Sequence, residues 1–110
     1  MNVSFEDYEA YLLCTYGNSV TEQGLFMKLV EEIGEVAEVL NMRAGRKKVN
    51  GEDMQTQLAN ELADVIHYVV GIAAINDIDL SGTIIDKDKK AAVKYHHNTC
   101  LESFLMSRKE

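Results

Sequence analysis

Acidic side chains recur at a fixed spacing in two segments of this chain. The first segment holds Glu32 and Glu35, and the second holds Glu61 and Asp64 at the equivalent positions 29 residues later. Residues three apart lie on neighbouring turns of one helix flank, where like charges repel. Partly desolvated carboxylates cost further free energy unless a positive charge lies between them. Because Mg²⁺ prefers carboxylate oxygens and also binds substrate phosphates, this spacing predicts a divalent-cation site for a phosphorylated substrate.

An apolar stripe runs beside each acidic pair and predicts how the pairs are positioned. At about 100° per residue, four aliphatic side chains of each segment fall within roughly 40° of one line, which is typical of a packed helix. They are Leu29, Ile33, Val36 and Leu40 in the first segment, and Leu58, Leu62, Val65 and Val69 in the second. We expect the two helices to pack stripe to stripe and to bring the four acids together at the edge of the apolar seam.

A solvated acidic face is the alternative interpretation of these acids. It applies most to Glu31 and Glu38, which lie opposite the first stripe, and less to Glu32 and Glu61, which border the stripes. The absence of cysteine and of an obligatory histidine from the pattern argues against zinc as the bound ion.

Together, these acids and their surroundings resemble a known enzyme family. The order Glu31-Glu32-x-x-Glu35, then 25 intervening residues, then Glu61-x-x-Asp64 is similar to the signature of the all-α nucleoside triphosphate pyrophosphatases, specifically the MazG-like proteins. The likeness extends over roughly residues 25 to 95. It implies a Mg²⁺-dependent enzyme, with Mn²⁺ as a substitute ion, that hydrolyses a nucleoside triphosphate to the monophosphate and pyrophosphate. A related branch acts on phosphoribosyl-ATP, and the choice of base and sugar, like a house-cleaning role in the nucleotide pool, stays open.

The resemblance implies roles for individual residues. The metal ligands would be Glu32, Glu35, Glu61 and Asp64, and the residues that bind substrate would be Lys28, Tyr68 and Lys87. Either Glu31 or Glu38 would position the attacking water or accept its proton. Lys28 is equally suited to an ion pair with Glu32, and Tyr68 to a half-buried core position. One departure from the family pattern is Ala91, which stands where an asparagine is common.

Other polar and aromatic residues allow two interpretations each. The basic stretch Arg46-Lys47-Lys48 is either a solvated loop or a clamp for phosphate. The aromatic residues of the first helix form the core or line a pocket for the nucleobase. His67 falls opposite the second stripe, so we expect it to be exposed. The group His96, His97 and Cys100 lacks an evident fourth ligand for zinc.

The fold predicted from these patterns is all-α. Helices are expected at 5–16 after a Ser4 cap, at 20–44 after a Ser19-x-x-Glu22 cap, from an Asp53 cap to 75, and from an Asp79 or Ser81 cap to 95. A short helical segment is expected after residue 98. We predict a single domain spanning 1–110, an antiparallel bundle of four main helices plus the C-terminal segment, completed by assembly into a homodimer or homotetramer.

Composition limits the classes of partner and compartment. Apolar residues make up 46% of the chain and the net charge is −7, which disfavours a nucleic-acid polymer as partner because a polyanion needs a basic face. The chain contains no uncharged run of 18 residues that would suggest a membrane span. The N-terminus does not have the pattern of a signal peptide. We therefore expect a cytoplasmic protein with no membrane partner, whose thiols at Cys14 and Cys100 are reduced and buried.

Two other functions are alternatives to the nucleotide hydrolase. One is a non-catalytic helical interaction protein whose acidic faces serve solubility. The other is a di-iron carboxylate bundle, which requires Glu-x-x-His pairs on two helices. Only Asp64-x-x-His67 approximates such a pair, so the di-iron site is the weaker alternative.

Overall fold

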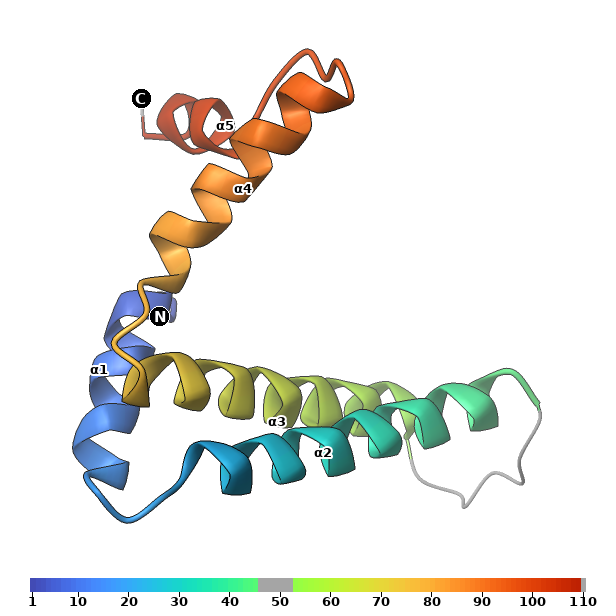
Figure 1. The fold of residues 1–110 in the computed structure, drawn as a ribbon. Coiled ribbons are helices and arrows are strands. Elements are labelled where there is room, and N and C mark those ends of the chain that lie inside the picture. The colour runs from blue at the N-terminus through green and yellow to red at the C-terminus, as the bar shows by residue number, and fades with distance from the viewer. Residues whose placement is uncertain (46–52, 110) are drawn as a thin grey trace.

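Five helices account for the part of the chain that this computed structural model describes, residues 1–45 and 53–109 (Figure 1). They are α1 (Phe5–Tyr16), α2 (Glu22–Arg43), α3 (Met54–Ile75), α4 (Leu80–Lys94) and α5 (Leu101–Ser107). No strand occurs within these described ranges. The prediction of an all-α protein is confirmed.

Polar side chains cap the helices largely where the sequence placed them. The side chains of Ser4, Asp53 and Asp79 each accept a hydrogen bond from a backbone N–H in the first turn of α1, α3 and α4, which satisfies one of the free donors there. The cap of α2 differs from the prediction, because it is Thr21 rather than Ser19. The Ser19 hydroxyl instead donates to the backbone carbonyl of Tyr16, so α2 begins at Glu22.

The helices do not form a bundle of four within the described chain. α2 and α3 lie side by side and antiparallel, and α1 packs across one end of this pair against α3 (Figure 1). α4 contacts α1 and α5 but extends away from the α2–α3 pair. The radius of gyration is 17.2 Å, whereas a compact chain of this length has about 13 Å. One copy alone therefore leaves much helix surface uncovered.

The best-buried core lies where α1 crosses α3. Leu12 of α1 is 1% exposed, and Val70 and Ala74 of α3 are 0% and 7% exposed. Tyr8, Tyr16 and Leu80 pack around these three side chains. This small core attaches α1 and the start of α4 to the end of the α2–α3 pair.

The α2–α3 seam differs from the predicted stripes in a way that matters for the acids. The buried residues of α2 are Leu25, Glu32, Val39 and Met42, so Glu32 lies within the seam instead of at its edge. Ile33 and Leu40 of the predicted stripe are 52% and 47% exposed. The apolar surface of α2 is wider than a single neighbouring helix covers, and α3 covers only one half of it.

The same displacement occurs on α3. Its buried residues are Val70, Gly71, Ala73 and Ala74 near the C-terminal end. Leu62 and Val69 of the predicted stripe are 46% and 38% exposed, and their neighbour Ile66 is 47% exposed. Apolar side chains on α2 and α3 therefore form two outer stripes that the described residues of the same chain leave partly exposed. The outer stripes comprise Phe26, Val30, Ile33 and Leu40 of α2, and Leu62, Ile66 and Val69 of α3.

Two further expectations are corrected or qualified. Cys14 is exposed and Cys100 half-buried, and both thiols are free, so the expectation of two buried cysteines was wrong.

α3 is long and apolar enough to cross a membrane by length and composition. This is weak evidence, because core helices of soluble proteins pass the same test, and α3 carries Glu61 and Asp64 along its length.

Replacing Leu12 by alanine tests the small core. We expect Leu12→Ala to lower the free energy of unfolding by about 2–5 kcal/mol, since a buried leucine leaves a cavity. Leu13→Ala is the matched control, because Leu13 is the next residue of α1 and is 49% exposed. Urea unfolding followed by circular dichroism gives both values. An equal loss in the two variants would contradict the assigned core.

Candidate metal and nucleotide site

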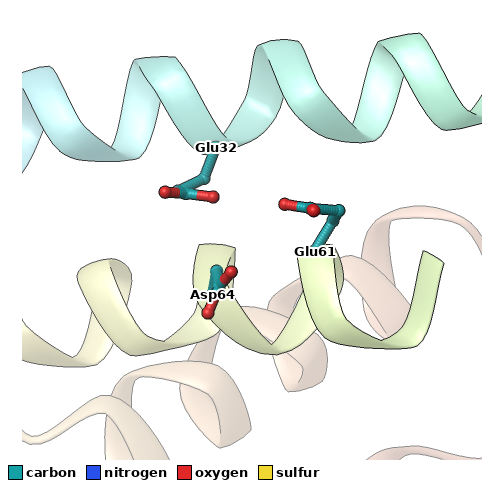
Figure 2. Close-up of side chains that lie close together, drawn as sticks. All are labelled: Glu32, Glu61 and Asp64. Carbon is teal, nitrogen blue, oxygen red and sulfur yellow. The ribbon is translucent and has the colours of Figure 1, made fainter. Parts of the chain in front are cut away.

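Three carboxylates from α2 and α3 converge on one point of the seam. Glu32 extends from α2 toward Glu61 and Asp64 of α3 (Figure 2). One oxygen from each of the three lies within 4.8 Å of the others. The antiparallel packing of α2 and α3 places these residues opposite one another, so the repeated acidic pairs of the sequence meet in space.

Two of these carboxylates are poorly solvated and incompletely paired. Glu32 is only 8% exposed, and Glu61 is half-buried. The Oε2 atoms of both residues are buried and accept no hydrogen bond from the described chain. A buried carboxylate oxygen without a partner is costly, and this cost points to a cationic ligand.

Mutual repulsion and burial raise the proton affinity of the seam acids. Hydrogen bonding with the Glu35 carboxyl, followed by burial and by the charges of Glu35, Glu32 and Asp64, raises the pKa of Glu61 to about 7. Burial is the largest cause that raises the pKa of Glu32, and Glu35 is the next. Glu35 thus belongs to the same electrostatic unit. We call Glu32, Glu35, Glu61 and Asp64 the acidic cluster.

The acidic cluster has the chemistry of a site for a hard divalent cation. Two carboxylate oxygens that bind the same Mg²⁺ or larger hard cation lie at most about 4 to 5 Å apart, which agrees with the spacing of Glu32, Glu61 and Asp64. Oxygen is the only ligand atom these three side chains offer, which suits magnesium or manganese better than zinc. All four predicted metal ligands are part of the cluster, three by convergence and Glu35 by its interaction with Glu61.

The two acids proposed for catalysis lie on α2 outside the seam. Glu31 is exposed and accepts a salt bridge from Lys28 Nζ at 3.1 Å. Lys28 therefore pairs with Glu31, and not with Glu32 as one interpretation of the sequence had it. Glu38 is exposed one turn beyond Glu35. The catalytic roles of Glu31 and Glu38 remain predictions.

A pocket adjoins the acidic cluster toward α1. Its volume is about 430 Å³, and its lining combines aromatic, aliphatic and small polar residues of α1, α3 and the start of α2. Lys28 and Tyr68 line it, and each lies one helical turn from a cluster acid, Glu32 and Asp64 respectively. We call it the α1–α2 pocket. The remaining lining residues are Tyr16, Ser19, Val20, Thr21, Gly24 and Leu25.

His67 is not exposed as the sequence suggested. It is half-buried between α3 and α1, with its Nδ1 3.2 Å from the Tyr8 hydroxyl and its Nε2 2.5 Å from the Tyr16 hydroxyl. The angular argument considered only packing against α2, whereas α1 covers the opposite side of α3. A sequence signal did exist, since Tyr8 and Tyr16 are eight residues apart and share one face of a helix.

Within residues 1–45 and 53–109, the substrate-binding lysine predicted on α4 does not lie on the α2–α3 pair that carries the acidic cluster. Lys87 is exposed on α4, which extends away from the α2–α3 pair (Figure 1). Lys89 of the same helix pairs with Glu102 of α5 at 3.1 Å. Arg46, Lys47 and Lys48 lie outside the described residues. The substrate role of Lys87 stays a prediction.

Comparison with known proteins agrees with the geometry of the acids. Residues 20–97 match the family model of the MazG nucleotide pyrophosphohydrolase domain. The matched range contains the whole acidic cluster, Tyr68 and α4, and it excludes α1. No curated protein and no solved structure matches the chain.

The raised pKa of Glu61 predicts how stability depends on pH in the metal-free protein. Between the ordinary glutamate pKa of 4.5 and about 7, the unfolded chain loses this proton while the folded chain keeps it, so folding becomes less favourable as pH rises. We expect the melting temperature in EDTA to increase as pH is lowered from 7.5 to 5.5. Glu61→Gln, which stays neutral, should flatten this dependence.

The matched control is Glu6→Gln, because Glu6 is exposed in the first turn of α1 and lies away from the cluster. That variant should keep the wild-type pH dependence. Equal slopes for wild type and Glu61→Gln in differential scanning fluorimetry would show that Glu61 is not held protonated in the seam.

Proposed function

The chain belongs to the MazG nucleotide pyrophosphohydrolase family, and from this premise we propose that it hydrolyses a nucleoside triphosphate to a nucleoside monophosphate and pyrophosphate with Mg²⁺. The observation that carries the proposal is the convergence of Glu32, Glu61 and Asp64 in the seam, with buried oxygens that lack partners on Glu32 and Glu61. Manganese is expected to substitute, since it also takes oxygen ligands.

Residues of the acidic cluster would hold the cation, with Glu32 and Glu61 presenting their unpartnered oxygens and with Glu35 and Asp64 as the other predicted ligands. A bound divalent cation neutralises phosphate charge and lowers the pKa of a bound water. The requirement for a cation also explains how a chain of net charge −7 can bind an anionic substrate.

Other side chains of the site would bind and orient the reactants. Lys28 lies beside the cluster and at the edge of the α1–α2 pocket, where its ammonium would contact phosphate. Tyr68 would contact the nucleoside. In the reaction, a water oxygen bonds to the α-phosphorus while the bond from that phosphorus to the bridging oxygen breaks, and pyrophosphate leaves. Glu31 or Glu38 would accept the proton of the water.

Assembly into a homodimer or homotetramer is the second part of the proposal. The outer stripes expose seven large apolar side chains on α2 and α3, from 38% at Val69 to 53% at Phe26. Contiguous apolar surface of this kind is typical of a protein interface, and the large radius of gyration supports the same conclusion. A second α2–α3 pair packed on these stripes would give four packed helices from two chains, which differs from the bundle of four helices within one chain that the sequence predicted.

Substitution of a cluster acid tests catalysis separately from folding. We expect Asp64→Asn to reduce pyrophosphate release from nucleoside triphosphates at least 100-fold, because a metal ligand is lost. The fold should remain intact or become slightly more stable without metal, since one repulsive charge is removed. Circular dichroism and a Mg²⁺-dependent pyrophosphate assay measure the two properties.

Asp86→Asn is the control for this experiment, because Asp86 is exposed on α4 outside the cluster. It should retain activity. Mg²⁺ or Mn²⁺ should also raise the melting temperature of wild type and Asp86→Asn by mass action, and should raise that of Asp64→Asn much less. Full activity of a folded Asp64→Asn protein would refute the proposed function.

A charge on an outer stripe tests assembly. We expect Ile33→Glu to shift the protein to a lower oligomeric state in sedimentation velocity experiments, because a desolvated carboxylate would face the apolar surface of a second copy. Tyr11→Glu changes a residue that is 63% exposed on α1 and should leave the sedimentation coefficient unchanged. A monomeric wild-type protein at all concentrations would exclude the proposed assembly.

A further inference from the structure

One imidazole connects both tyrosines of α1 to α3. The His67 ring lies between the Tyr8 and Tyr16 hydroxyls, 3.2 Å and 2.5 Å from its two nitrogens. It contacts the rings of Tyr8, Tyr16 and Tyr68 in edge-on geometry, with centroid distances of 6.2, 5.8 and 4.9 Å. His67 is thus the junction of an aromatic group, and two of its neighbours, Tyr16 and Tyr68, line the α1–α2 pocket.

The Tyr16 ring is held on a second side by close packing. Gly71 of α3 is buried, and a Cβ atom at this position would lie 3.1 Å from Cε2 and 3.7 Å from the hydroxyl of Tyr16. Glycine therefore allows the ring to approach the α3 backbone closely. The ring contact and the hydroxyl contact together define where Tyr16 stands in the pocket wall.

Hydrogen-bond accounting leaves the Tyr16 hydroxyl one further interaction. A neutral imidazole has one donor and one acceptor nitrogen, so one tyrosine donates to His67 and the other accepts. If Tyr16 accepts, its O–H is free to donate to a ligand. If Tyr16 donates, its oxygen is free to accept. Burial, and then the neighbouring phenols Tyr68 and Tyr8, raise the pKa of Tyr16, which keeps the hydroxyl protonated at neutral pH.

We propose that Tyr16 is a specificity-determining contact to the polar edge of the nucleobase and that His67 is its positioning residue; this inference rests on the proposed function. The cation and phosphates would occupy the acidic cluster. The pocket that contains Tyr16 begins one helical turn away, next to Lys28 and Tyr68, and its volume of about 430 Å³ lies in the range of small-ligand sites.

Tyr8 and Tyr16 come from a different helix than the acids. The matched residues 20–97 include the acids and His67, whereas Tyr8 and Tyr16 lie before them on α1. A hydroxyl supplied by α1 can therefore select the base separately from the acids that would hold the cation. A hydrogen bond to a particular base edge discriminates because a mismatched base leaves buried polar groups unpaired.

The experiment compares kcat and KM over a panel of nucleoside triphosphates that differ only in base. Tyr16→Phe keeps the ring on Gly71 and removes the hydroxyl. We expect KM for the preferred base to rise about tenfold, the preference in kcat/KM over the next-best base to fall about tenfold, and kcat to change less than about threefold. Tyr11→Phe on the exposed side of the same helix should change none of these values.

His67 variants test the positioning role. His67→Leu should reproduce the loss of base preference, and His67→Gln, whose amide can reach the same hydroxyl, should recover part of it. The double variant Tyr16→Phe/His67→Leu should be no less selective than either single variant. Should His67→Leu fail to fold, Tyr16→Phe and His67→Gln carry the same comparison.

Unchanged base preference in a folded Tyr16→Phe protein would overturn the inference, as would fully additive effects of the two residues. These outcomes leave the proposed function standing, because pyrophosphate is still released. If wild type releases pyrophosphate from no triphosphate in the panel, the proposed function fails and this inference fails with it.

Discussion

Repulsion between carboxylates in a packed seam is the constraint on which this structure depends. Leu25, Glu32 and Val39 follow one another at seven-residue intervals along the buried side of α2, a spacing at which a helix pair ordinarily has three apolar residues. Glu32 occupies the middle position and faces Glu61 and Asp64 across the seam (Figure 2). The α2–α3 pair therefore gives up apolar burial at its centre, and the cation of the proposed function would offset the lost stability.

Such a seam must be supported at its periphery. At one end α1 closes the pair with Leu12, Val70 and Ala74, the only cluster of fully buried apolar side chains identified among residues 1–45 and 53–109. In the assembly that we propose, another copy of the chain would cover the outer stripes. Under the proposed function and assembly, folding would be coupled to both metal binding and assembly, because each would stabilise the folded chain.

The residues near each helix start were enough to predict the helices. Packing between helices determined which of their faces are buried. The side chains of Ser4, Asp53 and Asp79 cap helices through contacts within three residues, so these helix starts could be predicted. The repeat of acids 29 residues apart was sufficient to predict their convergence, since two similar helices packed antiparallel meet near their equivalent positions.

The exposure of Ile33 and the burial of Glu32 could not be read from periodicity. Both residues lie on the side of α2 that carries its apolar residues. The part of that side that faces α3 depends on the shape of α3 and on what covers the remaining part. His67 was misplaced for a related reason: its surroundings come from α1, and a helical angle measured against α2 contains no information about a third helix. The direction in which α4 extends, away from the α2–α3 pair, likewise depends on tertiary packing.

Under the proposed function, the α2–α3 seam and α1 have separate roles. The seam acids offer only carboxylate oxygens, so under the proposed function they would hold the cation that binds the polyphosphate and would not distinguish one base from another. Discrimination between bases requires directional donors and acceptors held at fixed positions. In the described chain those positions adjoin α1, where the contacts of Tyr16 with His67 and Gly71 fix a hydroxyl against α3, the helix that carries Glu61 and Asp64. Since α1 also closes the core, packing would constrain a change of base preference through Tyr16, whereas charge would constrain the phosphate chemistry proposed for the seam.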